Sequence, residues 1–167
     1  MKSTDKSELF LSVINANKGI IYKVANSYCK NSENRNDLVQ EIIIHLRKSF
    51  ENYNHQYEHS TWMYRISLNV AISFYRKAKK EIATPLTEHI IELASEDEPG
   101  ELEDNVRLLY QFIGEMDELN KALMLLYLDN KTHKEMAEVL GISETNVATK
   151  IGRIKEKLRN KFSLANN

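Results

Sequence analysis

The sequence predicts an all-α protein of two helical domains, joined by an acidic flexible linker, with a C-terminal helix-turn-helix. Apolar residues recur at intervals of three and four along most of the chain, and no segment reads as a strong strand. Both prolines, Pro85 and Pro99, fall in a weakly periodic, acid-rich stretch between residues 81 and 100. We therefore expect domains at residues 1–80 and 101–167, with residues 81–100 as the linker.

The first two helices are expected over about residues 5–29 and 37–50. Gly19 is expected to bend or break the first helix, since glycine costs about 1 kcal/mol relative to alanine in a helix. Residues 31–36 form a polar connector, so Asp37 and Glu41 would lie in the first turns of the second helix, where acids favour the helix dipole. The apolar stripe of this second helix consists of Leu38, Ile42, Leu46 and Phe50.

A third helix is expected over about residues 60–80, after a polar loop at residues 51–59. One side of this helix carries Met63, Ile66, Val70 and Phe74. Another side carries a basic stripe with an aromatic residue at its edge, formed by Trp62, Arg65, Asn69, Arg76 and Lys80. The stripe indicates either a surface for unstacked bases and phosphates or a core tryptophan beside solvated cations, and the spacing favours neither.

In the second half, helices over about residues 101–114 and 117–129 are expected to support a helix-turn-helix from Thr132 to Lys161. Thr132 and Glu135 suit a capping box, and Met136, Ala137 and Leu140 give the first helix its apolar face. Gly141 supplies the positive φ of a sharp turn, and Ile142 follows as a buried plug. Ser143 suits the cap of a second helix, whose apolar stripe is Val147, Ile151, Ile154, Leu158 and Phe162.

The side of this last helix opposite its apolar stripe is polar, with Asn146, Thr149, Arg153 and Glu156, flanked by Thr145 and Lys150. Short hydrogen-bonding side chains beside Lys and Arg suit base edges and phosphates in a major groove. The alternative is a helical hairpin with a solvated polar face. The spacing of cap, alanine, glycine, cap and valine favours DNA binding.

Bulk composition indicates a soluble cytoplasmic protein. The chain has 167 residues, 42% of them apolar, and a single cysteine, so no internal disulfide is possible. The N-terminal residues lack the apolar region of a signal peptide, and no apolar run is long enough to insert into a membrane.

The net charge of −1 is unevenly distributed. Residues 60–80 carry five cations and no carboxylate, and residues 131–161 carry eight Lys and Arg against four Glu. Between these basic segments, residues 81–118 carry twelve acids and one arginine. Because nonspecific DNA affinity comes from phosphate neutralisation, the near-neutral chain is expected to bind bare DNA poorly and to need a partner there.

The order of these features resembles the extracytoplasmic-function group of bacterial sigma factors, the promoter-reading subunits of RNA polymerase. DLVQEIIIHLRKSF (Asp37–Phe50) is similar to the family's polymerase-docking helix, and STWMYRISLNVAISFYRK (Ser60–Lys77) to its promoter-melting helix. The stretch Thr132–Arg159 is similar to its reader of the upstream promoter element. The resemblance covers about residues 10–161 and implies a promoter-specificity subunit that is not an enzyme.

The resemblance also implies roles for individual residues. The clamp helices of the largest polymerase subunit would meet Asp37, Leu38, Gln40 and Glu41. Residues 52–59 would capture a flipped base of the −10 element, whose DNA contacts would be Asn52, Tyr53, Tyr57, Trp62, Arg65, Asn69 and Arg76. The −35 element would be contacted by Thr145, Asn146, Thr149, Lys150 and Arg153, with Thr132 and Lys134 on backbone phosphates. The implied partners are core RNA polymerase, promoter DNA and an anti-sigma factor.

Other classes of protein fit less well. A stand-alone helix-turn-helix regulator on its own operator would need an effector or phosphoacceptor domain in the first half, which shows no βα alternation. A module that binds polymerase without promoter specificity is a third class. A zinc enzyme is disfavoured because Glu58 precedes the second histidine of the His55 and His59 pair instead of following the first. We expect no catalytic residue, metal or cofactor.

Overall fold

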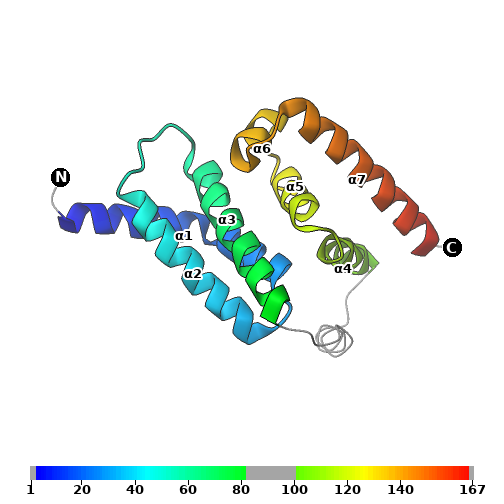
Figure 1. Cartoon of the computed structure of the whole chain (residues 1–167), viewed down its shortest axis with the longest axis horizontal. Helices are drawn as coiled ribbons and strands as arrows, with labels where there is room; N and C mark the ends of the chain where they lie inside the picture. Colours follow the sequence, from blue (N-terminus) through cyan, green and yellow to red (C-terminus); the bar gives the residue numbers. More distant parts are fainter. Residues whose placement is uncertain (1–2, 82–100, 166–167) are drawn as a thin grey trace. The chain divides into compact units, whose positions relative to one another are not determined.

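The computed structural model describes residues 3–81 and 101–165, and all regular structure in these residues is helical (Figure 1). The chain divides into two compact units, residues 1–89 with α1–α3 and residues 90–167 with α4–α7. The predicted all-α fold is therefore confirmed. Of the predicted linker, residues 82–100 lie outside the described residues. Among the described helices, none is long and apolar enough to cross a membrane.

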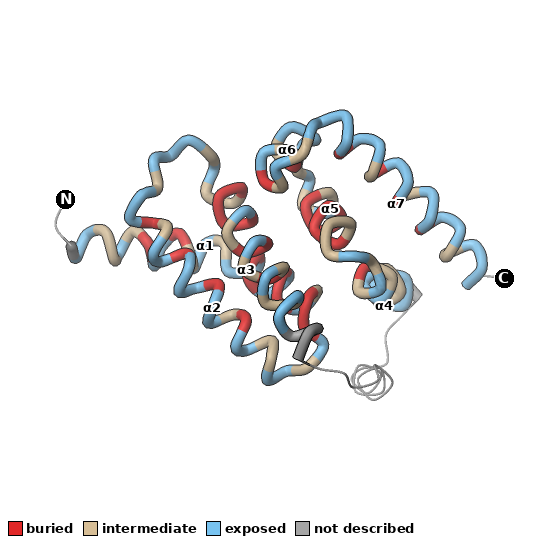
Figure 2. Tube along the Cα trace, in the orientation of Figure 1, coloured by how far each residue is buried: buried red, intermediate tan, exposed pale blue. Residues whose placement is uncertain are grey.

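The first unit consists of α1 (Ser3–Tyr28), α2 (Ser32–Phe50) and α3 (His59–Glu81), each packed against the other two. The predicted stripe of α2 is buried, with Leu38, Ile42 and Leu46 fully inaccessible. Burial of such a side chain stabilises the fold by roughly 1.5–3 kcal/mol. The buried positions of α2 recur along one side of the helix (Figure 2).

A distortion occurs in α1 at Asn17, not at Gly19 as predicted. Asn17 has φ −125° and ψ 17°, outside the helical region. Its side-chain amide donates to the carbonyl oxygen of Val13 at 3.0 Å, so a side chain enters the helix's own hydrogen-bond ladder there. Gly19 itself stays helical.

The helix α2 begins five residues earlier than predicted. The Asn31 side chain caps it by accepting from the backbone amides of Glu33 at 2.7 Å and Asn34 at 3.4 Å. The polar residues after Asn31 are thus the first turns of the helix and not a connector. Asp37 and Glu41 lie further along α2, beyond its first turn. A favourable interaction with the helix dipole therefore does not explain why an acidic residue occurs at Glu41.

The buried side of α3 is wider than the predicted stripe. Of the four residues in that stripe, Met63 is fully buried, and Ile66, Val70 and Phe74 are only half-buried. The buried arc also takes in Thr61, Trp62, Tyr64, Ser67, Leu68 and Ala71. The reason is that α3 packs against both α1 and α2, so it must bury more than one stripe.

Aromatic rings hold the loop between α2 and α3 onto the core. The Tyr53 ring stacks on Phe50 at 6.0 Å and lies 5.0 Å from Trp62, and its hydroxyl donates to the carbonyl oxygen of Tyr57. Trp62 is 7% exposed, so of the two interpretations of this residue the core position is confirmed. Burial raises the pKa of the Tyr53 phenol above its usual value.

The second unit consists of α4 (Glu101–Gly114), α5 (Glu118–Leu128), α6 (His133–Leu140) and α7 (Glu144–Ala165). The central helix is α5, which packs against the other three and buries every residue from Lys121 to Leu126 (Figure 2). The predicted stripe of α7 is buried from Val147 to Leu158, and Phe162 meets Phe112 edge-on at 5.3 Å. Ile142 is half-buried and not fully buried as predicted.

The start of α2 generates a prediction for stability. Asn31→Ala should lower the free energy of unfolding of the first unit by about 1 kcal/mol, because two helix amides lose their acceptor. The control is Ser32→Ala, at an exposed position that is already helical. Urea unfolding followed by the fluorescence of Trp62, the only tryptophan, reports on this unit alone. Equal stability of the two variants would contradict the observed cap.

The half-buried phenol of Tyr53 generates a prediction for pH dependence. Folding raises the pKa of Tyr53, so the folded state favours the neutral phenol. The resulting contribution to the free energy of unfolding is fully present below the ordinary tyrosine pKa of about 10, and it is lost as the pH rises above that value. Between about pH 8 and about pH 10.5 the wild type should lose more stability than Tyr53→Phe, measured by the same fluorescence. Tyr22→Phe, at an exposed position on α1, should behave as the wild type. Identical pH profiles for Tyr53→Phe and wild type would contradict the prediction.

Candidate nucleic-acid interface

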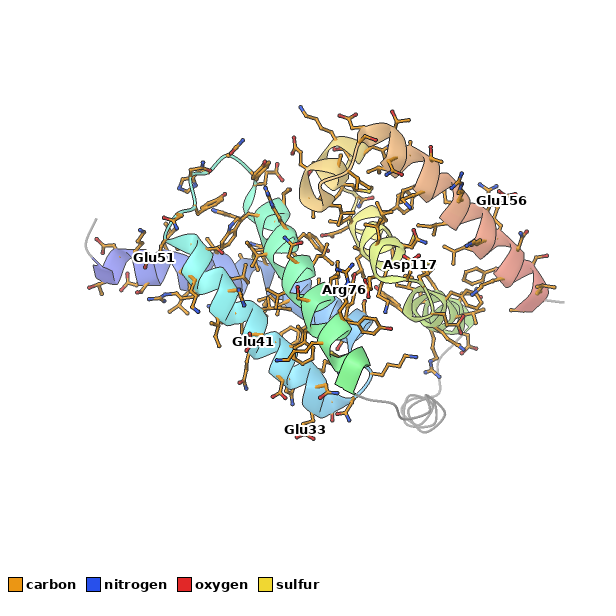
Figure 3. All side chains as sticks on the ribbon, viewed as in Figure 1. Glu33, Glu41, Glu51, Arg76, Asp117 and Glu156 are labelled. Atoms are coloured by element: carbon orange, nitrogen blue, oxygen red, sulfur yellow. The ribbon has the colours of Figure 1, made fainter. Side chains whose placement is uncertain are left out.

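The exposed side of α3 carries the polar residues that the sequence predicted. Arg65 and Asn69 are exposed and lie one turn apart, and Arg76 is exposed two turns further on (Figure 3). The buried arc of the same helix fixes this orientation, because Tyr64 and Leu68 beside them are held in the core. The side chain of Lys80, the last member of the predicted stripe, lies outside the described residues.

The loop before α3 brings aromatic residues next to this basic side. The Arg65 guanidinium carbon lies 5.9 Å from the centroid of the Tyr57 ring, within the range of a cation–π contact. Tyr53 and Tyr57 are half-buried, and Asn52 is exposed. The structure therefore groups Tyr53, Tyr57 and Arg65, whereas Trp62 lies against Tyr53 and supports the loop from inside the core.

The same loop contains a shallow pocket, and the sequence analysis assigned only two of its lining residues, Tyr53 and Tyr57, to DNA contacts. Its lining residues are Tyr53, His55, Gln56, Tyr57, Glu58 and His59. His55 has a positive φ of 61°, which turns the chain sharply at the tip of the loop. The only sequence signal of the pocket is the run of aromatic and imidazole rings in an otherwise polar loop.

A second exposed polar surface lies on α2. Asp37, Gln40 and Glu41 are exposed, and Glu41 lies 3.7 Å from His45 on the next turn (Figure 3). Leu38, predicted to contact the polymerase, is fully buried in the core, since it belongs to the stripe that faces α1 and α3. An apolar residue that the sequence analysis overlooked, Ile44, is 48% exposed on this helix.

The helix-turn-helix forms as its caps predicted. The Thr132 hydroxyl accepts from the Glu135 amide at 3.1 Å, and the Glu135 carboxylate accepts from the Thr132 amide at 3.2 Å. Gly141 ends α6 with a φ of 69°, and the Ser143 hydroxyl accepts from the Asn146 amide at 3.1 Å. Lys134 is exposed on the first turn of α6. Both the amide and the hydroxyl of Thr132 are engaged in this capping box, and the Thr132 side chain is exposed.

The polar side of α7 faces away from the unit's core. Thr145, Asn146, Thr149 and Arg153 are exposed, and Lys150 is half-buried at their edge. The stripe that anchors α7 lies on the other side, with Val147 and Ile151 nearly inaccessible. Glu156 follows the polar residues one turn beyond Arg153 (Figure 3). All five predicted contacts to the −35 element thus belong to one helical surface.

No group of three or more His, Cys, Asp or Glu side chains suited to a metal ion occurs among residues 3–81 and 101–165. His55 and His59 are brought together, with ring centroids 6.1 Å apart, but each also contacts the Tyr53 ring. The pair therefore belongs to the aromatic packing of the loop.

Comparison with known protein families identifies both units. Residues 13–81 match the model of sigma-70 region 2, and residues 107–158 match that of sigma-70 region 4. A stand-alone regulator would need an effector domain in the first half of the chain, and that half matches sigma-70 region 2 instead. Nothing in either match favours that alternative.

Curated relatives and solved structures agree with these matches. The chain is 28% identical to the RNA polymerase sigma factor SigV of Bacillus subtilis (strain 168) over 159 residues, covering 95% of this chain and 93% of that one. It is 26% identical to the ECF RNA polymerase sigma factor SigM of the same organism, over 83% of this chain and 86% of that one.

Two solved structures share the fold. The structure of CnrH in complex with the cytosolic domain of CnrY has a TM-score of 0.68 at 19% identity, covering 95% of this chain and 90% of that one. The sigma factor RpoE, in a complex with the anti-sigma factor NepR from Bartonella quintana, has a TM-score of 0.69 at 15% identity over 95% and 97%. With both sigma-70 regions matched in order on a two-unit helical fold, this chain belongs to the extracytoplasmic-function (ECF) group of sigma-70 factors of bacterial RNA polymerase.

Proposed function

We propose that this sigma factor divides promoter recognition between its units, with residues 1–80 acting at the −10 element and residues 101–167 at the −35 element. The observation that carries the proposal is the same in both units. One helix, α3 or α7, is anchored by a buried apolar side and keeps a polar side with arginine exposed. Such a side chain set provides donors for base edges and phosphates on a rigid support.

At the −10 element, the loop and α3 would act on the separated strand. Extrusion of a base costs a few kcal/mol of lost stacking. Stacking on the loop's aromatic rings, worth about 1–3 kcal/mol per base, would offset much of that cost. Arg65, over the Tyr57 ring, and Asn69 on the next turn would then hold the strand that leaves the loop. Trp62 contributes by supporting Tyr53 and not by direct contact.

The second unit would insert α7 into the major groove of the −35 element. Thr145, Asn146, Thr149, Lys150 and Arg153 would face the bases and the nearest phosphates. Thr132 and Lys134, at the start of α6, would contact the DNA backbone, where the helix N-terminus also favours a phosphate.

Core polymerase would dock on α2 through Asp37, Gln40 and Glu41. These three residues are exposed, and the helix dipole gives no reason for the acid at Glu41. The nearby exposed side chain of Ile44 adds an apolar contact of the kind that protein interfaces bury. With a net charge of −1, the chain alone has little electrostatic affinity for DNA, so the polymerase would supply much of the affinity of the complex for the promoter.

The factor would act in the cytoplasm as a specificity subunit without a catalytic step of its own. We also propose an anti-sigma partner that holds it inactive. The relative RpoE is bound to an anti-sigma factor in its solved structure, which supports such a partner here. The basic segments at residues 60–80 and 131–161 are the surfaces that an inhibitor would cover.

The first test concerns promoter opening. The double variant Arg65→Ala, Asn69→Ala should still bind core polymerase and yet lose most of its open complexes, because both changes remove contacts to the separated strand and neither lies on α2. Pull-down with core polymerase measures the first property, and permanganate reactivity of unpaired thymines measures the second. Normal opening by the variant would refute the role of α3.

The second test concerns the −35 element. Arg153→Ala should weaken use of a promoter with an intact −35 element by about 1–3 kcal/mol, the value of a good base-edge contact. On a promoter whose −35 element is scrambled, variant and wild type should differ little. Arg159→Ala, also exposed on α7 but outside the proposed surface, is the control. Run-off transcription measures all three, and an equal loss on both promoters would exclude specific readout by Arg153.

A further inference from the structure

The middle of α7 contains a glycine that the fold itself does not require. Gly152 lies inside the helix, and its φ is not positive, unlike that of Gly141. A Cβ atom added at Gly152 would meet no heavy atom of residues 3–81 and 101–165 within 4 Å. Glycine is less favourable than alanine in a helix interior, because it loses more backbone freedom on folding. Neither the backbone conformation nor packing against the described residues therefore explains this glycine.

Gly152 lies on the exposed side of α7 that is proposed to face the −35 element. It follows Thr149 by three residues and precedes Glu156 by four, and residues at these intervals are neighbours on a helix surface (Figure 3). At 100° per residue, Gly152 points about 60° away from the centre of the side opposite the buried stripe. Lys150 lies on the other flank of that side. One flank of the surface thus carries a lysine, and the other exposes helix backbone.

A helix in the major groove has little free space at its flanks. With its side chains a helix is about 10–12 Å across, and the groove is about 12 Å wide. When the centre of the exposed side points toward the base edges, its flanks point toward the two sugar–phosphate strands that form the groove walls. A lysine reaches a phosphate of one wall with a long side chain. A glycine allows the other wall to approach the helix backbone itself.

We propose that Gly152 is the position at which one sugar–phosphate strand of the −35 element lies directly against α7. The missing side chain sets how deeply the helix enters the groove, and hence whether Thr149 and Arg153 reach the base edges. Gly152 is thus a positioning residue that acts by the space it leaves. The inference rests on the proposed function, in which α7 inserts into the major groove.

The test compares stability with promoter use in the full chain. In Gly152→Ala, the backbone amides of α7 should exchange with solvent roughly fivefold more slowly, since alanine favours the helix. With core polymerase, the same variant should use a promoter with an intact −35 element on the order of tenfold less well, the effect of one lost base-edge contact. Gly152→Leu should lose more, because its side chain is larger. On a scrambled −35 element, both variants and wild type should differ little.

The matched control is Gly19→Ala in α1. Gly19 is also helical and exposed, and a Cβ atom there would likewise meet no described atom within 4 Å. This variant should slow amide exchange in α1 and leave run-off transcription from both promoters unchanged. A loss of transcription by Gly19→Ala equal to that of Gly152→Ala would overturn the inference, because a general effect of helix stability would then be the cause.

A second variant separates close approach from flexibility of α7. Ala148 is exposed one turn before Gly152, so the double variant Ala148→Gly, Gly152→Ala keeps one glycine in the helix but fills the space. If close approach matters, the double variant should use the intact −35 element no better than Gly152→Ala. Recovery of wild-type use by the double variant would overturn the inference in favour of flexibility.

The remaining outcomes distinguish this inference from the function on which it rests. If Arg153→Ala loses use of the intact −35 element and Gly152→Ala and Gly152→Leu do not, the inference is overturned and the proposed function stands. An equal loss by Gly152→Ala on intact and scrambled elements also overturns the inference. If neither Arg153→Ala nor the Gly152 variants change the use of either promoter, the proposed function and the inference both fail.

Discussion

The burial of one side of each helix is the constraint on which the rest of the structure depends. In α3 the residues from Trp62 to Ala71 that face inward hold the helix against α1 and α2, and in α7 the stripe from Val147 to Leu158 holds it against its own unit. The polar side chains on the opposite sides are therefore presented in a fixed orientation. Contacts to DNA depend on such rigidity, since a displacement of about 1 Å loses hydrogen-bond geometry.

The same constraint supports the proposed division of promoter binding between the two units. Each unit is small, and once its apolar side is buried only a few exposed polar residues remain for a partner, such as Arg65 and Asn69 or Thr149 and Arg153. Neither set neutralises many phosphates, and the acids between residues 81 and 118 cancel much of the positive charge. A chain of this kind gains specificity when a large partner holds both surfaces on one promoter, since linked binding events reinforce each other. The exposed acids and Ile44 on α2 would suit a surface on which such a partner docks.

The parts of the fold that depend on local sequence were predictable. The capping box of Thr132 and Glu135, the turn at Gly141 and the stripe of α2 are encoded within a few residues, and all three are confirmed. Features that depend on tertiary packing were not. The wide buried arc of α3, and with it the burial of Trp62, follows from packing against two helices at once. The distortion at Asn17 and the early start of α2 arise from competing side-chain hydrogen bonds, which periodicity does not register. The pocket residues of the loop share no period at all.

Footprinting of one promoter, with the chain alone and with the chain bound to core polymerase, tests the central claim most directly. At about 0.15 M salt, where long-range charge effects are screened, the chain alone should protect nothing. Together with core polymerase it should protect both the −35 and the −10 regions. Strong protection by the chain alone would contradict the account, and so would a complex with polymerase that protects neither region.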